Sequence, residues 1–262
     1  MLRALYTAAS GMEAQQLNID TIAHNLANIN TTGFKQRRAQ FQDLLYQNIR
    51  AAGAANTSNT DIPTGLQVGL GTRPVATEIL FTQGDFSVTN NPLDVVIQGN
   101  GFFQIRQVNG QIAYTRNGSF HLNKDGNLVT SEGDLLEPQI TIPPDQISMH
   151  IGSDGTVSVL QAGQTDAQKI GKIDLALFTN PAGLQNLGKS LFVPTQASGQ
   201  AITGTPGENG LGTLQSGYQE QSNVSVVEEM VSMIVSQRAY EANSKVIRSA
   251  DEMFTQANNL VR

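Results

Sequence analysis

A repeated three-and-four spacing of apolar residues near the N-terminus constrains this chain more than any other feature. The positions that follow this spacing are Leu2, Leu5, Ala9, Met12, Gln16, Ile19, Ala23 and Leu26. A repeat of about 3.5 residues is typical of a helix that packs along another helix, and only Gln16 interrupts it. Tyr6, Ile22 and Ile29 lie beside this stripe and widen it. The pattern predicts one helix from Leu2 to about Ile29, roughly 40 Å long at about 1.5 Å per residue.

A second long helix is predicted near the C-terminus, from about Val224 to Val261. One stripe along it consists of Val226, Met230, Met233, Gln237, Tyr240, Ser244, Ile247, Asp251, Phe254, Asn258 and Val261. Another stripe consists of Val235, Ala239, Ala242, Val246, Ser249, Met253, Gln256 and Leu260. Because a helix with one partner needs one stripe, two partial stripes predict contact with more than one neighbour. The chain offers only one other long helix, so the remaining neighbours would be other molecules.

Between these helices the sequence changes to short alternating strands separated by turn signals, from about residue 76 to 194. Asn109-Gly110, Asp125-Gly126 and Asp154-Gly155 are dipeptides that favour tight hairpin turns, and β-rich segments flank each of them. The segments "GKIDLALF" and "KSLFVPT" add further strands. The predicted fold class is therefore α+β, with an all-β middle domain between two terminal helices.

Two polar stretches join these zones, "RAAGAANTSNTDIPTG" and "TQASGQAITGTPGENGLGTLQSG". Their Gly, Ser and Thr content predicts extended or loop-rich connections without a core of their own. We therefore expect three parts. Residues 1–33 plus 223–262 form a helical domain, 34–75 plus 195–222 form a connecting layer, and 76–194 form the all-β domain. The two helices are expected to pair antiparallel as a discontinuous coiled-coil stem.

Composition excludes several classes of function. Only 15% of the residues are charged, against about 25% in an ordinary soluble domain, and the net charge is −6. Without a Lys/Arg cluster the chain is a poor ligand for nucleic acid. No apolar run approaches the roughly 20 residues that span a bilayer, and polar residues such as Ser10 and Glu13 interrupt the N-terminal stretch, so no signal peptide is expected. The absence of Cys excludes disulfides and thiolate chemistry.

No catalytic or metal-binding constellation emerges from the titratable residues. His24, His121 and His150 lie in three separate contexts without a paired spacing. The stretch from His121 to Glu132, "HLNKDGNLVTSE", matches part of a calcium-binding loop. His121 stands where the first Asp should be, and no helix is predicted on either side, so a β-hairpin is the better interpretation. We expect no catalytic residue, no metal site and no cofactor.

Three stretches carry a resemblance to a known family. They are "LNIDTIAHNLANINTTGFKQRRAQFQDLL" near the N-terminus, "NNPLDVVIQGNGFFQI" followed by "YTRNGSFHLNKDGNLVTSEGD" in the middle, and "SNVSVVEEMVSMIVSQRAYEANSKVIRSADEM" near the C-terminus. In this order they resemble the three signatures of the bacterial flagellar rod and hook family, and they cover most of the chain. The chain length and the segment "LLYQNIRAAGAANTSNTDIPTGLQVGLGTRPVATE" resemble the distal-rod branch of that family.

The resemblance implies a structural subunit rather than an enzyme. It implies that the terminal helices form the inner tube of a helical homopolymer, that the linkers form an intermediate layer, and that the β domain faces outward. Such a polymer would be a rigid drive shaft of the basal body that spans the periplasm and transmits torque to the hook. The implied partners are copies of the same chain, the proximal rod proteins, the hook protein, the P-ring and L-ring proteins, and the flagellar type III export apparatus, which exports subunits without a cleaved signal peptide.

The two helices supply the candidate residues for an assembly interface. They are Leu2, Leu5, Met12, Ile19, Ile22, Asn25, Leu26, Asn28, Val226, Met230, Met233, Tyr240, Ile247, Phe254 and Leu260. In the first linker, the resemblance associates the long connection with a straight, stiff shaft. The candidates for this stiffening are Tyr46, Pro63, Gly65 and Gly69.

Asparagines cluster where the first helix is expected to end, although Asn weakens a free helix. We hypothesise that Asn25, Asn28 and Asn30 fix the register of packed helices through amide hydrogen bonds. Gly33 would supply the left-handed turn that ends the helix. A frayed helix end with ordinary turn residues is the alternative.

Two other functions compete with a distal-rod subunit. Within the same family, the chain could be a proximal rod or hook subunit. From a different class, it could be a secreted β-domain adhesin with a helical multimerisation stem, which would require a secretion signal that the sequence lacks.

Overall fold

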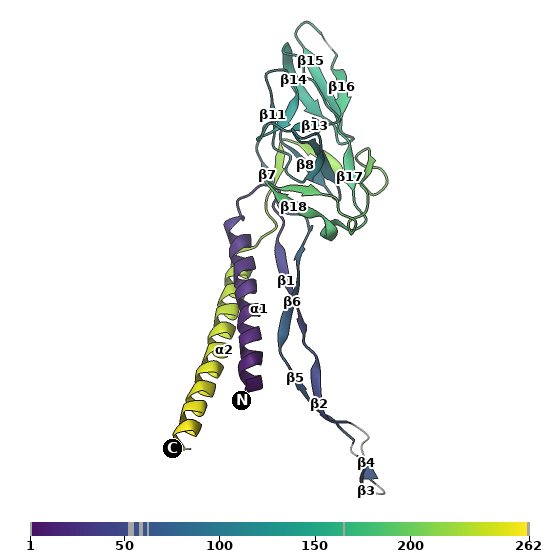
Figure 1. Ribbon diagram of the computed structural model, residues 1–262. Coiled ribbons are helices and arrows are strands. Elements are labelled where there is room, and N and C mark those ends of the chain that lie inside the picture. The colour runs from purple at the N-terminus through teal and green to yellow at the C-terminus, as the bar shows by residue number, and fades with distance from the viewer. Residues whose placement is uncertain (1, 52–54, 58–59, 62, 165, 261–262) are drawn as a thin grey trace. The chain divides into compact units, whose positions relative to one another are not determined.

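The computed structural model describes residues 2–51, 55–57, 60–61, 63–164 and 166–260 (Figure 1). In chain order, one long helix precedes a β-rich middle and a second long helix follows it. Helix α1 spans Leu2–Ala27 and helix α2 spans Val226–Leu260. Both confirm the helices predicted from apolar spacing, since α1 ends two residues before Ile29 and α2 begins two residues after Val224. The α+β class is confirmed as well.

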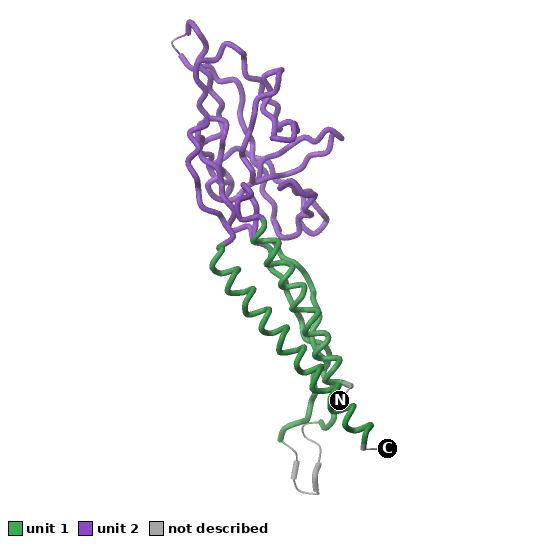
Figure 2. The backbone as a smooth tube through the Cα atoms, turned by 90° about the vertical axis from the view of Figure 1, so that its left-hand side faces the viewer, with its two compact units in different colours: residues 1–27, 37–78, 225–262 green, residues 28–36, 79–224 purple. Residues whose placement is uncertain are grey.

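The chain divides into two compact units, which Figure 2 colours separately. Unit 1 comprises residues 1–27, 37–78 and 225–262, and unit 2 comprises residues 28–36 and 79–224. Each unit is thus built from segments that lie far apart in the sequence. The three-part division expected from the sequence stays a prediction.

Unit 1 contains the helices and a long two-stranded ribbon. The strands of the ribbon are β1 (Arg37–Asp43), β2 (Tyr46–Arg50), β3 (Ala55–Thr57), β4 (Thr60–Asp61), β5 (Leu66–Gly69) and β6 (Thr72–Ile79). Strand β1 pairs with β6, β2 with β5, and β3 with β4, so the chain runs out along one side and returns along the other. Strands β3 and β4 belong to the polar stretch that was expected to be an extended connection, and residues 52–54, 58–59 and 62 of this stretch lie outside the described part of the chain.

Local electrostatics favour the start of α2. Glu228 and Glu229 lie in its first turn, where a negative charge interacts favourably with the helix dipole. The backbone N–H of Glu229 donates to the carbonyl of Ser225 at 3.0 Å and closes that turn. Among the described residues, neither helix is both long and apolar enough to cross a membrane.

Unit 2 is an assembly of short strands. They are β7 (Phe86–Val88), β8 (Val95–Gln98), β9 (Phe102–Arg106), β10 (Ile112–Thr115), β11 (Phe120–Leu122), β12 (Leu128–Thr130), β13 (Leu135–Glu137), β14 (Gln146–Ile151), β15 (Thr156–Gln161), β16 (Gln168–Lys172), β17 (Leu175–Leu177), β18 (Gln185–Gly188), β19 (Leu191–Val193), β20 (Ile202–Gly204), β21 (Thr213–Ser216) and β22 (Tyr218–Glu220), with a short 3-10 turn at Pro181–Gly183. The largest sheet has the order β11-β12-β13-β9-β10-β19-β18, and β17 joins it through β9 and carries β20. Strands β14, β15 and β16 form a second sheet.

All three predicted hairpins are confirmed. Strands β9 and β10, β11 and β12, and β14 and β15 pair antiparallel around the predicted turns. Gly110, Gly126 and Gly155 each take a positive φ between 78° and 82°, as such turns require. The stretch that resembles a calcium loop is therefore a hairpin, in which the side-chain oxygen of Asn123 accepts the backbone N–H groups of Asp125 and Asn127 at 2.9 Å.

A continuous apolar core lies inside unit 2. Phe103, Phe120 and Leu136 are almost completely buried in its main cluster, and the rings of Phe103 and Phe120 meet edge to face at 5.1 Å. A smaller cluster gathers around Phe102 and Phe192. Unit 2 thus buries its large apolar side chains within the chain itself.

The return segment from 195 to 222 differs from the expected loop-rich connection. Its strands β20, β21 and β22 pair with β17, β8 and β7, and its side chains Leu211 and Leu214 belong to the main core cluster. The apolar residues of this segment are too sparse to show a strand period, so their place in the core depends on partners that are distant in sequence.

Candidate assembly surface

Small and polar side chains line the seam between α1 and α2, which lie side by side in Figures 1 and 2. The Asn18 Nδ2 donates to the Ser236 Oγ at 2.8 Å. The Asn25 Nδ2 donates to the Glu229 Oε1 at 3.1 Å. Ser236 and Glu229 are both buried, as is Asn25. The helices are therefore antiparallel, with the end of α1 beside the start of α2.

Gly11 allows the two helices to approach closely. A Cβ atom at this position would lie 2.9 Å from the Nδ2 of Asn243, inside the range that real Cβ atoms avoid. Other residues in the seam are also small, because Ala8, Ala14 and Ala250 are buried. The contact between α1 and α2 thus relies on small residues and hydrogen bonds more than on large apolar side chains.

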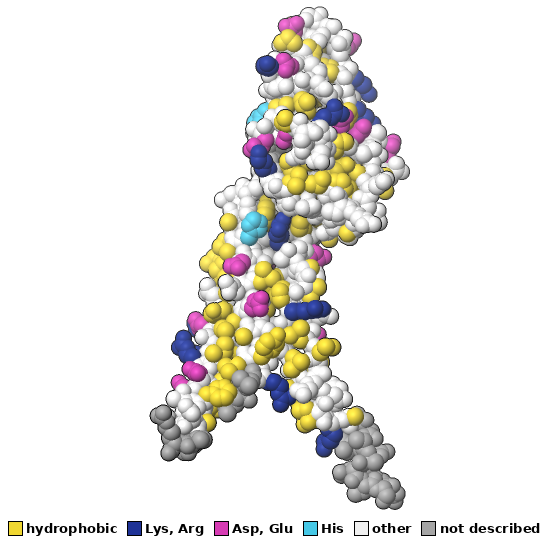
Figure 3. All heavy atoms as spheres, in the orientation of Figure 1, with side chains coloured by type: hydrophobic (Ala, Val, Ile, Leu, Met, Phe, Trp, Pro, Cys, Tyr) yellow, Lys and Arg dark blue, Asp and Glu magenta, His cyan; other side chains and the backbone are white. Residues whose placement is uncertain are grey.

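An apolar surface covers the side of α2 that is turned away from this seam. By the helical period, its centre at Val227, Val231 and Ile234 lies across the helix from Glu229 and Ser236, whereas Val226, Met230 and Val235 lie toward the sides. We define the apolar face of α2 as Val226, Val227, Met230, Val231, Ile234 and Val235, whose exposed fractions range from 42% to 72%. Figure 3 shows hydrophobic side chains gathered over the helical part of unit 1. A contiguous apolar surface of this kind is typical of a protein–protein interface.

The ribbon of unit 1 also exposes large apolar side chains. They are Phe41, Leu45, Tyr46, Ile49, Leu66 and Val75, with exposed fractions from 38% to 84%. Helix α1 contacts the ribbon, for example where the Ser10 hydroxyl accepts the Thr72 N–H, but it leaves these side chains exposed. The ribbon is therefore a second candidate surface for binding another molecule.

The candidate residues of the ribbon show one local contact. Tyr46 stands opposite Gly69 across β2 and β5, and a Cβ at Gly69 would lie 3.4 Å from the Tyr46 ring. The ring thus covers the glycine backbone. A hydrogen bond with the Asp43 side chain raises the pKa of the Tyr46 hydroxyl. Pro63 and Gly65 are exposed.

The predicted interface residues of the helices divide by burial. Ile22 and Asn25 are buried, while Leu5, Met12, Ile19, Leu26, Asn28, Met233, Ile247 and Phe254 are half-buried. Val226, Met230 and Tyr240 are exposed. The side chains of Leu2 and Leu260 lie outside the described part of the chain.

The buried positions of α2 do not follow the predicted apolar stripe through Val226 and Met230. They are Glu229, Ser236 and Ala250 instead. A search for apolar residues misses this seam because its members are polar or small.

The asparagine cluster is divided between two roles. Asn25 donates to the carbonyl of Arg37 at 2.8 Å and accepts the Arg37 N–H at 2.9 Å, in addition to its bond to Glu229. It therefore connects α1, α2 and the start of β1. Asn28 belongs to the turn after the helix, where its carbonyl accepts the N–H of Thr31 at 3.1 Å. Asn30 is exposed.

Gly33 has the left-handed conformation that the sequence predicts, with φ at 69°. The prediction that it ends the first helix is wrong, because α1 ends at Ala27, six residues earlier. The Gly33 N–H donates to the carbonyl of Glu220 at 2.9 Å. A Cβ here would lie 2.7 Å from the backbone nitrogen of Asn117. Only glycine fits this close approach between two segments of unit 2.

A buried ion cluster in unit 2 was missed by sequence reasoning. The Lys35 Nζ lies 2.7 Å from the Glu220 Oε1, and the Arg116 Nε lies 3.3 Å from the Glu220 Oε2. All three side chains are at most 4% exposed. Lys35 also donates to the carbonyl of Thr82 at 2.7 Å. No sequence pattern indicates this site, since Lys35 and Glu220 are 185 residues apart.

Burial sets the electrostatics of this cluster. Loss of hydration lowers the pKa of Lys35 and of Arg116, whereas the charge of Glu220 opposes both shifts. Arg116 further donates to the carbonyls of Gly99 and Gly101 at 2.8 and 2.7 Å. The cluster ties the segment after α1, the β9–β10 region and the return segment together.

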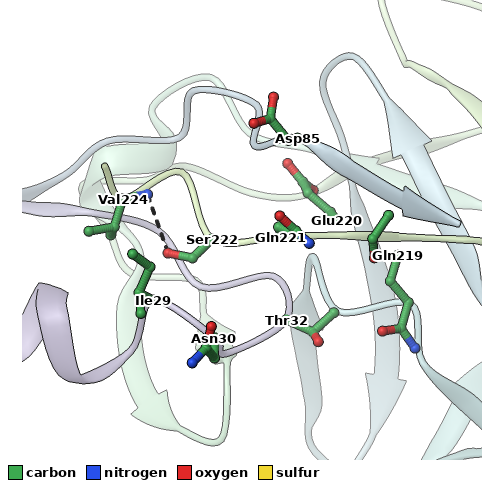
Figure 4. Close-up of a pocket in the computed structure, with 10 residues that line it drawn as sticks. Ile29, Asn30, Thr32, Asp85, Gln219, Glu220, Gln221, Ser222 and Val224 are labelled. Atoms are coloured by element: carbon green, nitrogen blue, oxygen red, sulfur yellow. Dashed lines mark hydrogen bonds between the residues drawn. The ribbon is translucent and has the colours of Figure 1, made fainter. Parts of the chain in front are cut away.

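A polar cavity of about 490 Å³ lies beside the cluster (Figure 4). Its lining includes Asn30, Thr32, Asp85 and Gln219, which surround the opening in Figure 4. The described lining contains the hydroxyls of Ser87 and Ser222 but no His, Lys or Cys side chain. Among the described residues, no group of three or more His, Cys, Asp or Glu side chains is arranged to hold a metal ion. This cavity therefore offers no set of groups for catalysis.

Comparison with known proteins gives three matching family models. They are described as "Flagella basal body rod protein" for residues 5–35, "Flagellar hook protein FlgE/F/G D1 domain" for residues 96–159, and "Flagellar basal body rod FlgEFG protein C-terminal" for residues 215–260.

Relatives match over the full length of the chain. The chain is 51% identical over 264 residues to the flagellar basal-body rod protein FlgG of Borreliella burgdorferi, with 100% of both chains covered. It is 50% identical over 260 residues to the protein of the same name from Buchnera aphidicola subsp. Schizaphis graminum, covering 99% of this chain and 100% of the relative. Identity to the protein of that name from Bacillus subtilis is 39% over 268 residues, with 100% of both chains covered.

Proposed function

Since the chain belongs to the flagellar basal-body rod protein family and is a structural, non-enzymatic subunit of the distal rod, we propose that its copies polymerise into a rigid helical shaft that transmits torque to the hook. The chain acts in the rod of the basal body, together with other flagellar components. The proposal concerns how the subunits join and what the polymer does.

The exposed apolar face of α2 is the observation that carries this proposal. Complete burial of one Val or Ile side chain stabilises by roughly 1.5–3 kcal/mol. Three members of this face, Val231, Ile234 and Val235, are more than half exposed. A second copy that covers them would therefore gain substantial binding free energy. Helices that meet other helices on both sides can build a tube.

We further propose how the assembled subunit is layered. Residues 1–33 and 223–262 form an inner tube as a discontinuous coiled coil, residues 34–75 and 195–222 form an intermediate layer, and residues 76–194 form the outer domain. The antiparallel contact between α1 and α2 supports the coiled coil. The predicted interface residues, from Leu5 to Phe254, would be covered in this tube.

The ribbon is proposed to stiffen the shaft. Its apolar side chains, such as Leu45 and Ile49, are exposed and would be covered by neighbouring copies. Tyr46 packs over Gly69 within the ribbon and keeps its two strands in register. Pro63 restricts the backbone close to the tip of the ribbon.

The partners and the route to the rod are also proposals. We expect contacts with the proximal rod proteins, the hook protein and the P-ring and L-ring proteins along a shaft that spans the periplasm. We expect export as an unfolded chain through the flagellar type III apparatus, without cleavage of a signal peptide.

A clean deletion of the gene in its own bacterium tests the proposal. Electron microscopy of isolated basal bodies should show truncated rods without hooks, and the wild-type gene should restore them. A deletion strain with intact hooks and filaments would contradict the proposed role, and would favour the adhesin interpretation if it lost attachment to a surface instead.

A further inference from the structure

Close contacts between α1 and α2, two of them hydrogen bonds, recur with a regular spacing. They are Gly11 with Asn243, Asn18 with Ser236, and Asn25 with Glu229. Each step of one heptad forward along α1 is matched by one heptad backward along α2. We call these three contacts the rungs. They all lie on the same side of each helix, because a heptad returns close to the same face.

We propose that the rungs set the antiparallel register of α1 and α2 and thereby determine which side of α2 is presented to a second copy, the latter consequence resting on the proposed function. Polar residues in a helix seam specify register at the expense of stability, because a shifted helix leaves them without partners. An apolar seam lacks this penalty, since one Leu can replace another.

A shift of one heptad in either direction breaks the rungs. In one direction, Asn18 would stand opposite Asn243, and the Asn243 amide would have to move to admit its side chain. In the same shift, Asn25 would face Ser236, and Glu229 would lie beyond the end of α1 at Ala27. Glu229 is only 4% exposed, so losing the hydrogen bond from Asn25 would be costly.

The opposite shift fails for a similar reason. Ala4 would stand opposite Asn243, whose amide would have to move away from the Ala4 Cβ. Asn25 would face residue 222, before the start of α2 at Val226, and would lose Glu229. Only the observed register combines glycine against Asn243, Asn18 against Ser236 and Asn25 against Glu229.

The rungs also orient the apolar face of α2. Ser236 accepts from Asn18 across the seam and donates its own hydroxyl to the Ser232 carbonyl within α2 at 2.9 Å. The apolar face lies across the helix from these residues. A fixed register and rotation therefore keep Val231 and Ile234 available to a second copy.

Disulfide trapping in the purified full-length chain tests the proposal, because the chain has no Cys of its own. Gln15→Cys with Ala239→Cys places two thiols midway between rungs in the observed register. Gln15→Cys with Val246→Cys, or with Ser232→Cys, reports a shift of one heptad in either direction. Intramolecular disulfides are separated from intermolecular ones on non-reducing gels.

In the parent chain, the in-register pair should close at least about tenfold faster than either shifted pair, the ratio expected when a shift loses one buried hydrogen bond. A variant without hydrogen-bonding rungs carries Asn18→Leu, Ser236→Leu, Asn25→Leu and Glu229→Leu. In this variant the three pairs should close at comparable rates. If this variant still closed only the in-register pair, the proposal would be overturned, because the chain connections to unit 2 would then be sufficient to fix the register.

A matched exchange controls for lost folding. Asn18→Ser with Ser236→Asn retains one amide and one hydroxyl at the same rung and should keep the preference of the parent. If the four-site variant does not fold, the pair Asn18→Leu with Ser236→Leu alone should reduce the preference by severalfold. Loss of preference in the exchange variant, or no preference in the parent, would also contradict the proposal.

This readout does not depend on rod assembly. If the disulfide pattern is as expected but deletion of the gene leaves rods intact, the register proposal stands and the proposed function is refuted. If deletion truncates the rods but the four-site variant keeps the disulfide pattern of the parent, the proposed function stands and the register proposal is refuted.

Discussion

Unit 2 and unit 1 treat their apolar side chains in opposite ways. In unit 2, Phe103 and Phe120 are at most 1% exposed, and strands from distant parts of the sequence close around them. In unit 1, Val231 and Val235 are 56% and 62% exposed on a helix whose other side already has a partner. Unit 2 thus completes its core within one chain, whereas unit 1 leaves an apolar surface that we propose other copies cover.

The same contrast holds for polar groups. Unit 2 buries Lys35, Arg116 and Glu220 as a cluster that joins three of its own segments. In unit 1 the buried polar groups, such as Asn25 and Glu229, instead connect two helices. Unit 2 uses its buried polar groups for internal stability. We infer that unit 1 uses its own to fix which side of α2 faces a second copy.

Limited proteolysis of the dilute chain should show the largest difference between the units. Local opening spans free energies from about zero at marginal segments to the full stability of a core, often 5–15 kcal/mol. We expect the ends of α1 and α2 to be cut at least about a thousandfold faster than the strands of unit 2. Mass spectrometry of the fragments identifies the sites. Protease-resistant ends in a dilute monomer would show that unit 1 is already complete.

Removing the anion of the buried cluster should strongly destabilise unit 2. Glu220→Ala leaves Lys35 and Arg116 buried without a counter-ion, a change that typically costs about 3–5 kcal/mol. Denaturant unfolding monitored on the β-rich unit measures this loss. The matched control is Glu132→Ala, which removes the exposed partner of Lys189 and should cost less than about 1 kcal/mol. Equal effects of the two substitutions would refute an essential cluster.

Gly33→Val should destabilise by a smaller but clear amount. The left-handed conformation alone costs a non-glycine residue about 1–3 kcal/mol, and the side chain would also collide with the backbone of Asn117. Gly188→Val isolates the first contribution, since φ is 90° at Gly188 and nothing lies within 4 Å of its added Cβ. Thermal unfolding of both variants should place Gly33→Val lower. A Gly33→Val chain as stable as Gly188→Val would mean that the neighbouring backbone yields.

The smallest effect is expected at a rung of the helix seam. Asn18→Ala removes one hydrogen bond to Ser236, worth about 0.5–1.5 kcal/mol. Ser244→Ala on α2 removes a half-buried hydroxyl outside the rungs and serves as the control. Hydrogen exchange of the helices compares the two. If the helices of Asn18→Ala were as well protected from hydrogen exchange as those of the control, this rung would not stabilise the helix pair.

Local patterns predicted much of the architecture. The spacing from Leu2 to Leu26 predicted α1, and Asn109-Gly110 predicted a hairpin that β9 and β10 form, because helix periods and tight turns depend on neighbouring residues. The ion cluster was not predictable, since Lys35, Arg116 and Glu220 meet only after the whole of unit 2 has folded.

The seam of α2 shows a different limit. The sequence predicted apolar residues such as Val226 and Met230 as interface residues. They are exposed in the structure, while Ser236 and Glu229 are buried against α1. A count of apolar positions identifies the side of a helix that prefers to be covered. It does not say whether the same chain or another copy covers it.

Rod assembly by an apolar-face variant tests the central claim most directly. Ile234→Asp places a charge on the exposed apolar face of α2, and Ser232→Asp places the same charge on a neighbouring exposed position outside this face. Both variants should leave the unfolding of unit 2 unchanged. In a deletion strain, we expect Ile234→Asp to give truncated rods in electron micrographs, while Ser232→Asp builds complete ones. Complete rods with Ile234→Asp would contradict the claim that copies join through the apolar face of α2.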